Sequence, residues 1–132
     1  MPLLFVAILL LIPVVCSATG DIKCNLSGTQ IELNACAKDD FAQADKELND
    51  AYRAVVKMFA DDKLFISRLK LAQKSWIQYR DADLDAYFAC SDPDIRICFG
   101  SMFPLSYFSR KTAFTRERTN HLNQIIKHGR GE

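Results

Sequence analysis

Three long segments that follow Ser27 carry the hydrophobic spacing of amphipathic helices, and little sequence remains between them. Their apolar residues recur at steps of three and four, which places them along one face of a helix. We expect the first helix to begin near Thr29, the second to run from about Lys63 to Phe88, and the third to begin around 101–104. Helices joined by short connections lie antiparallel, so the sequence predicts an all-α, antiparallel three-helix bundle of up-down-up topology. The expected stripes are Phe41, Ala44, Leu48, Tyr52, Val55 and Phe59; Phe65, Leu69, Ala72, Trp76 and Tyr79; and Leu105, Phe108, Thr112, Thr115, Thr119, Leu122 and Ile126.

The expected helix ends carry residues that cap helices. Thr29 and Glu32 have the spacing of a capping box, in which each side chain satisfies the backbone N–H of the other residue. Residues 60–62 form the expected first turn, and its last aspartate can cap the second helix. Residues 90–103 contain turn-forming residues and are expected to be a loop. Gly129 is expected to end the third helix.

The first twenty residues have the composition of a secretory signal peptide. They contain no charged side chain, residues 2–15 are almost wholly apolar, and Cys16 to Gly20 are small. We expect cleavage after Ala18 or Gly20, which leaves residues 21–132 as one helical domain, periplasmic or secreted, without membrane association. The apolar run is shorter than the roughly 20 residues that span a bilayer. An uncleaved anchor and a lipid-modified Cys16 are the alternatives.

Four cysteines remain once this leader is removed: Cys24, Cys36, Cys90 and Cys98. An even number of cysteines in a short exported chain indicates disulfides, and four cysteines allow three pairings. We favour Cys24–Cys36 and Cys90–Cys98, because each pair is close in sequence and brackets a turn. Each bond should contribute roughly 2–3 kcal/mol, mostly by restricting the unfolded chain. Four free thiols in a reducing cytoplasm are the alternative.

The two expected turns set the register of the helices and place several polar residues at one level. Asn49 lies level with Gln73, and Gln73 lies level with about Arg118. These residues predict one polar layer inside the bundle, with Asp45 one turn away. We expect Asp45 or an acidic neighbour to pair with Arg80 or Arg118 in a structural network that fixes the register. A buried acid–base pair with a catalytic role is the alternative.

The net charge of +1 gives no field that would recruit nucleic acid or an anionic membrane. The charge is nevertheless uneven along the chain. Five aspartates and no basic residue lie between Asp81 and Asp94, whereas six basic residues and two acidic residues follow Gly100. Such runs are typical of solvated helix faces.

No arrangement of residues typical of an enzyme is visible. His121 and His128 are seven residues apart, which does not match the spacing of a metalloprotease site. The cysteines lack C-x-x-C spacing, and the chain has no G-x-S-x-G motif or phosphate-binding glycine loop. We therefore expect a protein that is not an enzyme and needs no metal or cofactor.

Residues 72–82 read A-Q-K-S-W-I-Q-Y-R-D-A. They resemble the A-Q-x-x-W-x-x-Y-R-D-A motif of the LprI-like family, which is named for a bacterial lysozyme inhibitor. Residues 29–52, with Thr29, Glu32 and Cys36, resemble the first half of that family, and Gly100-Ser101 and residues 115–122 resemble its closing elements. The resemblance runs from Cys24 to about Leu122. It implies an exported bacterial protein and, as the activity behind the family name, inhibition of lysozyme.

The sequence departs from the family pattern in its cysteines. The family usually has a cysteine just after the R-D-A triplet, where this chain has Leu84, and another early in the last helix, where the region near Arg110 has none. Cys90 and Cys98 replace that long-range bridge with a local one. The loop between the second and third helices is therefore the most individual part of this chain.

This loop supplies the candidate partner-binding residues, Ile95, Arg96, Phe99 and Phe103. A loop closed by a disulfide is ordered before binding, which reduces the entropy lost on association. Lysozyme has two catalytic carboxylates in its cleft, and Arg96 could pair with one of them. The nearby aspartates could meet the basic rim of a cationic lysozyme. The alternative is that the apolar loop residues simply cover the end of the core.

The sequence therefore predicts an exported binding protein that resembles lysozyme inhibitors and occludes a cell-wall-degrading enzyme without turnover. Its expected partner is a protein, with a lysozyme as the first candidate. The alternative is an envelope adaptor or toxin-immunity module that binds no lysozyme. The sequence makes no prediction of oligomeric state.

Overall fold

The computed structural model describes residues 21–131, in which every regular element is a helix and no strand occurs. Three long helices, α1 (Gln30–Met58), α2 (Lys63–Tyr87) and α4 (Phe103–His128), account for most of the chain. A short helix, α3 (Ile95–Phe99), and a 3-10 turn, η1 (Gly100–Met102), precede α4. The all-α prediction is confirmed for these residues, whereas the expected signal peptide and its cleavage site lie outside them.

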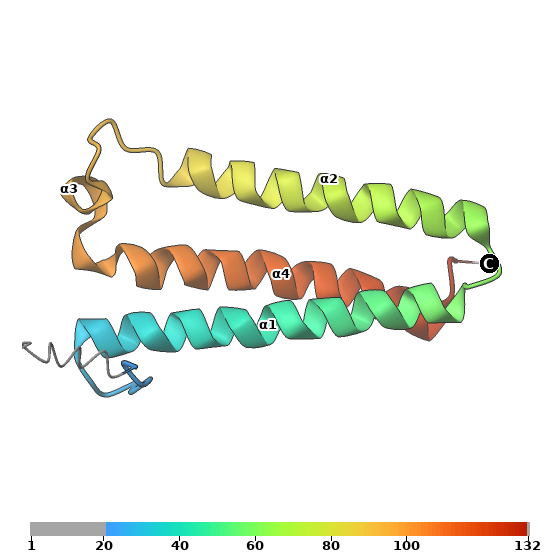
Figure 1. Ribbon diagram of the computed structural model, residues 1–132, viewed down its shortest axis with the longest axis horizontal. Helices are drawn as coiled ribbons and strands as arrows, with labels where there is room; N and C mark the ends of the chain where they lie inside the picture. Colours follow the sequence, from blue (N-terminus) through green and yellow to red (C-terminus); the bar gives the residue numbers. More distant parts are fainter. Residues whose placement is uncertain (1–20, 132) are drawn as a thin grey trace, which may run out of the picture.

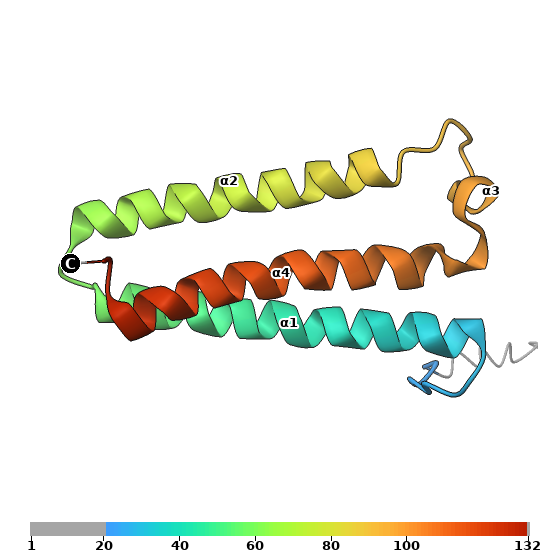
Figure 2. The same ribbon diagram turned by 180° about the vertical axis from the view of Figure 1, so that it is seen from behind.

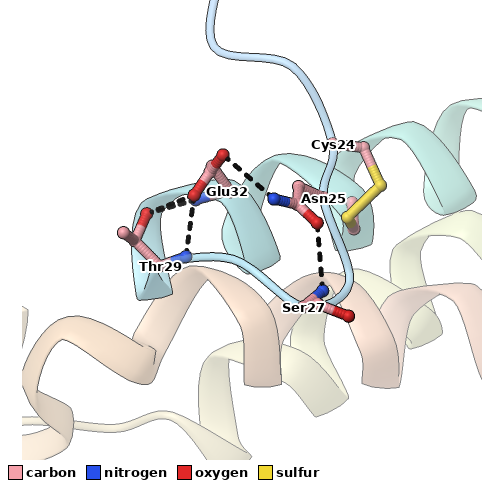
Figure 3. The surroundings of a disulfide bond; sticks show 6 residues. Cys24, Asn25, Ser27, Thr29 and Glu32 are labelled. Carbon is pink, nitrogen blue, oxygen red and sulfur yellow. Dashed lines mark hydrogen bonds between the residues drawn. A yellow bond between two sulfur atoms is a disulfide. The ribbon is translucent and has the colours of Figure 1, made fainter.

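The helix ends follow the local chemistry of the sequence. The backbone N–H of Glu32 donates to the Thr29 hydroxyl, and the backbone N–H of Thr29 donates to Oε2 of Glu32 at 2.7 Å, which completes the capping box (Figure 3). Asp62 accepts from the backbone N–H of Phe65 at 2.9 Å and begins α2. Gly129 ends α4 with a φ of +68°, a conformation that favours glycine. The three predicted caps are confirmed.

The three long helices lie roughly side by side along the length of the molecule (Figures 1 and 2). α2 returns along the molecule after the turn that follows α1, and α4 returns again in the direction of α1. In both views α4 lies against α1, while α2 is set farther from that pair. The start of α1, the end of α2, α3 and the start of α4 meet at one end, which we call the disulfide end.

Small side chains explain the close approach of α1 and α4. Ala37, Ala44 and Ala51 follow one another at steps of seven on α1, and all three are buried. The buried residues of α4 are Thr112, Thr115, Thr119 and Leu122. The hydroxyl of Thr115 donates to the carbonyl of Lys111 at 2.8 Å, and that of Thr119 donates to the carbonyl of Thr115 at 2.9 Å. Because the distance between helix axes depends on the side chains at the contact, this seam brings the two backbones together.

α2 meets the other helices through larger side chains. Its buried residues are Leu69, Arg80 and Leu84, and Trp76 packs against the core cluster that contains Leu69 and Leu122. The predicted stripe of α2 is wrong at two positions, the first of which is Tyr79, which is 60% exposed. Ala72 is exposed too. α2 rotates its larger residues toward the α1–α4 pair, which turns these two positions outward.

The two predicted disulfides, Cys24–Cys36 and Cys90–Cys98, are both present. The prediction of a loop throughout 90–103 is wrong, because α3 and η1 lie within it. Asp94 caps α3 by accepting from the backbone N–H of Arg96 at 3.0 Å. Gly100, with a φ of +62°, then separates α3 from the next turn. The sequence pattern was too short to reveal one helical turn of five residues.

Candidate partner-binding end of the bundle

The Cys90–Cys98 loop projects from the disulfide end as a compact, covalently closed unit. The disulfide joins the segment after α2 to the last turn of α3. Within the loop, the backbone N–H of Asp94 donates to the Asp92 carboxylate at 2.8 Å. Each turn of the loop is thus fixed by a side chain as well as by the cystine, so its exposed residues are held in place before any partner arrives.

Arg96 is the most prominent charged residue of this loop, with its side chain 74% exposed. Its Nε donates to Oδ1 of Asp94 at 2.9 Å, and its Nη2 donates to Oδ2 at 2.7 Å. These hydrogen bonds lower the pKa of Asp94 and raise the pKa of Arg96. The guanidinium is therefore already in the two-pronged geometry in which arginine binds a carboxylate.

The apolar candidates of the loop divide into two groups. Phe99 and Phe103 are half-buried, and their rings contact that of Phe88 with centroids 5.4 and 5.5 Å apart. Tyr107 joins the same aromatic cluster, 5.7 Å from Phe88. Ile95 is half-buried, whereas Ile97 is 70% exposed. Phe99 and Phe103 thus cover the end of the core, and Arg96 and Ile97 are the residues of α3 most available to a partner.

The chain segment before α1 lies at the same end of the molecule (Figure 1). The Cys24–Cys36 bond ties it to α1, and Asn25 donates to Glu32 at 3.4 Å (Figure 3). These bonds hold the segment beside α1, where a hollow of about 800 Å³ opens between its first residues and the starts of α1 and α4. The hollow and the exposed Ile22, Leu26 and Ile31 widen the apolar surface of the disulfide end.

A hydrogen bond links α1 to η1, the turn that precedes α4. The Asn34 side chain donates to the carbonyl of Ser101 at 3.1 Å. The sequence predicts the two cystines separately, without the surface that they share. An up-down-up order places the start of the first helix beside the second connection, so the topology contained the necessary signal.

Comparison with known proteins identifies the relatives of the chain. The sequence model of the lysozyme inhibitor LprI family matches residues 23–122, which is most of the chain. The chain belongs to the LprI family. An uncharacterized protein of Rhizobium meliloti (strain 1021) is 34% identical over 115 residues, covering 79% of this chain and 78% of the relative. No solved structure matches the chain.

The polar layer expected in this LprI-family bundle forms only in part. Nε of Arg118 donates to Oε1 of Gln73 at 2.9 Å, as the predicted register requires, and burial lowers the pKa of Arg118. Asn49 is exposed and donates instead to Asp45 on its own helix at 3.1 Å. The layer across three helices is thus reduced to one bond between α2 and α4, because α1 turns its small residues, not Asn49, toward α4.

Arg80 does not meet Asp45 in the LprI-family bundle. It forms an ion pair with the adjacent Asp81 at 2.8 Å, and its guanidinium lies 5.1 Å from the ring centre of Trp76. The Arg80 side chain is 8% exposed, so this stacking and the ion pair compensate for the cost of burying its charge. Trp76 serves as part of the core and as the platform of Arg80.

The acidic run has less free charge than its sequence suggests. Asp81 pairs with Arg80, Asp83 pairs with Arg110 at 3.2 Å, and Asp94 pairs with Arg96. These ion pairs partly neutralise three of the five aspartates, which weakens the expected attraction of this run for a basic surface. Asp85 and Asp92 are both exposed.

Residues 21–131 contain no group of three or more His, Cys, Asp and Glu side chains that could hold a metal ion. His121 and His128 are both exposed on α4. Over the same residues, no helix is long and apolar enough to cross a membrane.

Proposed function

We propose that this LprI-family protein is an exported inhibitor that binds a lysozyme through its disulfide end and blocks the enzyme without being turned over. The observation that carries the proposal is the pair Arg96 and Ile97, exposed together on a cystine-closed loop of a chain whose family is named for lysozyme inhibition. The family is one of inhibitors and not of enzymes. The predicted leader supports a periplasmic or secreted location.

The proposed contact has a simple chemical basis. Arg96 exchanges the carboxylate of Asp94 for one of the carboxylates in the cleft of lysozyme. Ile97 and Ile95 follow it to the rim of the cleft, where their apolar surface is removed from water. Because the loop is held by the Cys90–Cys98 bond, binding costs little additional ordering of the backbone.

The direct test is lysis of bacterial cell walls by lysozymes of several types, with the purified mature protein added in increasing amounts. The proposal predicts that lysis by at least one type stops near a one-to-one ratio. Undiminished lysis with every type would reject the proposal and favour an envelope adaptor or a toxin-immunity module.

Arg96→Ala tests whether the loop makes the contact. Truncation of one partner of a buried charge pair costs about 2–5 kcal/mol, so we expect the inhibition constant to rise by at least about thirtyfold. Arg68→Ala is the matched control, because Arg68 is an exposed arginine of α2 away from the disulfide end. Equal inhibition by the wild type and Arg96→Ala would show that Arg96 is not the contact.

A further inference from the structure

Two exposed tyrosines lie on α2: Tyr79 away from the disulfide end, and Tyr87 at the last residue of the helix, where its ring lies 4.9 Å from that of Phe88. Tyr79 is 60% exposed and Tyr87 is 59% exposed. They are eight residues apart, with Asp83 midway, so the three side chains lie on one face of the helix over about 12 Å. Large aromatic side chains are normally buried where a helix has a core to face, and α2 buries Leu69 and Leu84 instead.

Side chains of α4 complete this surface and hold the rings in place. The guanidinium of Arg110 lies 3.8 Å from the ring centre of Tyr87 and 5.5 Å from that of Phe114. It also pairs with Asp83 at 3.2 Å. The rings of Tyr79 and Phe114 meet edge to face, with centroids 6.2 Å apart. We call Tyr79, Asp83, Tyr87, Arg110 and Phe114 the tyrosine strip.

The tyrosine strip alternates apolar faces with polar groups along its length. The Asp83 carboxylate accepts hydrogen bonds, the Arg110 guanidinium donates them, and their charges cancel. Both side chains remain partly exposed, at 30% and 37%. A shallow depression of about 170 Å³ lies beside the strip and is lined by four residues of α4, Arg110, Ala113, Phe114 and Glu117.

We propose that the tyrosine strip binds a glycan chain of at least three linked pyranose units, of the N-acetylated amino-sugar class found in cell walls. A pyranose ring has a C–H face that packs on an aromatic ring and an edge of hydroxyls that both donate and accept hydrogen bonds. Tyr79 and Tyr87 supply two aromatic rings about 12 Å apart along the helix, a distance that matches the first and third units of a sugar chain, with Asp83 and Arg110 between them for the hydroxyls. The balanced charge fits an uncharged ligand better than an ionic one.

The choice of a cell-wall glycan rests on the exported location in the proposed function. A protein partner is the competing occupant, because tyrosine and arginine are also frequent at the centres of protein interfaces. The linear alternation of ring, charge pair and ring favours a chain of sugar units, since a protein hot spot is usually a compact cluster at the centre of its interface.

The test uses the full mature chain and insoluble peptidoglycan stripped of protein, with chitohexaose as a soluble competitor. We expect the wild-type protein to sediment with the wall, and chitohexaose to release it. The double variant Tyr79→Ala/Tyr87→Ala should sediment at least tenfold less. Leu71→Ala is the matched control, because Leu71 is 56% exposed on α2 outside the strip, and it should sediment like the wild type.

Amide chemical-shift mapping of the wild-type protein with chitohexaose is the second measurement and does not depend on any variant folding. Shifts confined to 79–87 and 110–117 support the proposal. It is overturned if the wild type does not sediment, if chitohexaose neither competes nor shifts these residues, or if Leu71→Ala loses as much binding as the double variant. A crude wall that still holds its proteins tests the competing occupant. If chitohexaose does not release the protein from this wall but protease treatment of the wall does, the partner is a protein.

Separate readouts distinguish this proposal from the inhibitor proposal. On a small soluble lysozyme substrate, the single variant Tyr79→Ala, which lies away from the disulfide end, should inhibit like the wild type but sediment less, whereas Arg96→Ala should lose inhibition and still sediment with peptidoglycan. If the wild-type protein shows only one of the two activities, inhibition of lysozyme or binding to peptidoglycan, only the proposal for the missing activity is rejected.

Discussion

The two ends of the bundle are closed in different ways. At the disulfide end, the Cys90–Cys98 cystine and an aromatic cluster hold a loop that leaves Arg96 and Ile97 exposed, while the other cystine and the capping box hold the segment before α1. At the opposite end, the short turn between α1 and α2 is covered by Arg130, which pairs with Asp62 at 3.0 Å and lies over the rings of Phe59 and Phe65. The disulfide end therefore uses covalent bonds to hold residues in exposed positions, and the opposite end uses side-chain packing to cover the turn.

The difference explains where a binding surface can form without loss of the fold. The end opposite the disulfides is called the turn end here. The buried cluster of Leu48, Val55, Leu69 and Leu122 packs with Phe59 and Phe65, near the turn end. The disulfide end has fewer fully buried aliphatic residues, and its cystines supply order that a larger core would otherwise provide. This arrangement leaves the loop residues free for a partner.

The largest expected effect is a loss of stability from a core substitution near the turn end. Leu122 is fully buried, so Leu122→Ala should lower the free energy of unfolding by about 2–5 kcal/mol through lost transfer energy and a residual cavity. Urea unfolding followed by circular dichroism measures this change, with the exposed Leu71→Ala as the control. If Leu122→Ala lowers the free energy of unfolding no more than Leu71→Ala does, the placement of Leu122 in the core near the turn end is contradicted.

The next effect separates stability from presentation at the disulfide end. Cys90→Ser/Cys98→Ser opens a short loop and should cost about 2–3 kcal/mol of stability. Because α3 then loses its anchor, inhibition of lysozyme should fall more than the folded fraction does. Cys24→Ser/Cys36→Ser is the matched variant, with a similar cost in stability and α3 still closed. Full inhibition by Cys90→Ser/Cys98→Ser would show that the closed loop is not needed for binding.

A smaller effect is expected at the cap of α2. Asp62→Ala removes the acceptor of the Phe65 N–H and the partner of Arg130, and loss of such a cap costs about 1 kcal/mol. Thermal unfolding should show a lower midpoint for Asp62→Ala than for Asp61→Ala, because the adjacent Asp61 is exposed and does not cap the helix through its side chain. Identical midpoints would contradict the assigned cap.

The smallest effect concerns the pH dependence of the capping box. Hydrogen bonds from the backbone and side chain of Thr29, and from Asn25, lower the pKa of Glu32 from its ordinary value of 4.5. A lowered pKa in the folded state means that this stabilisation is present above 4.5 and is lost as the pH falls through the folded value. NMR titration should give a Glu32 pKa below 4.5, and Glu32→Gln should remove that part of the acid dependence. A pKa at or above 4.5 would contradict the box.

The sequence predicted the features that depend on local chemistry. The capping box at Thr29, the cap at Asp62, the stop at Gly129 and both disulfides need only short-range patterns. The contact of Gln73 with Arg118 also followed, because two turns fix the register of three helices.

The features that depend on helix rotation could not be read from the pattern. Tyr79 belongs to a stripe with helical spacing, yet α2 turns Arg80 inward to stack on Trp76 and leaves Tyr79 exposed. The Asp94–Arg96 pair arises because a five-residue helix forms within the expected loop. Spacing along one chain does not determine which of two neighbouring stripes faces the other helices.

The most direct test of the binding assignment is hydrogen exchange of the mature protein, alone and in complex with a lysozyme that it inhibits. We predict slower exchange at 90–103 on binding and unchanged exchange at 56–66 around the opposite turn. Protection of 56–66 with no change at 90–103 would contradict the assignment of the partner surface to the disulfide end.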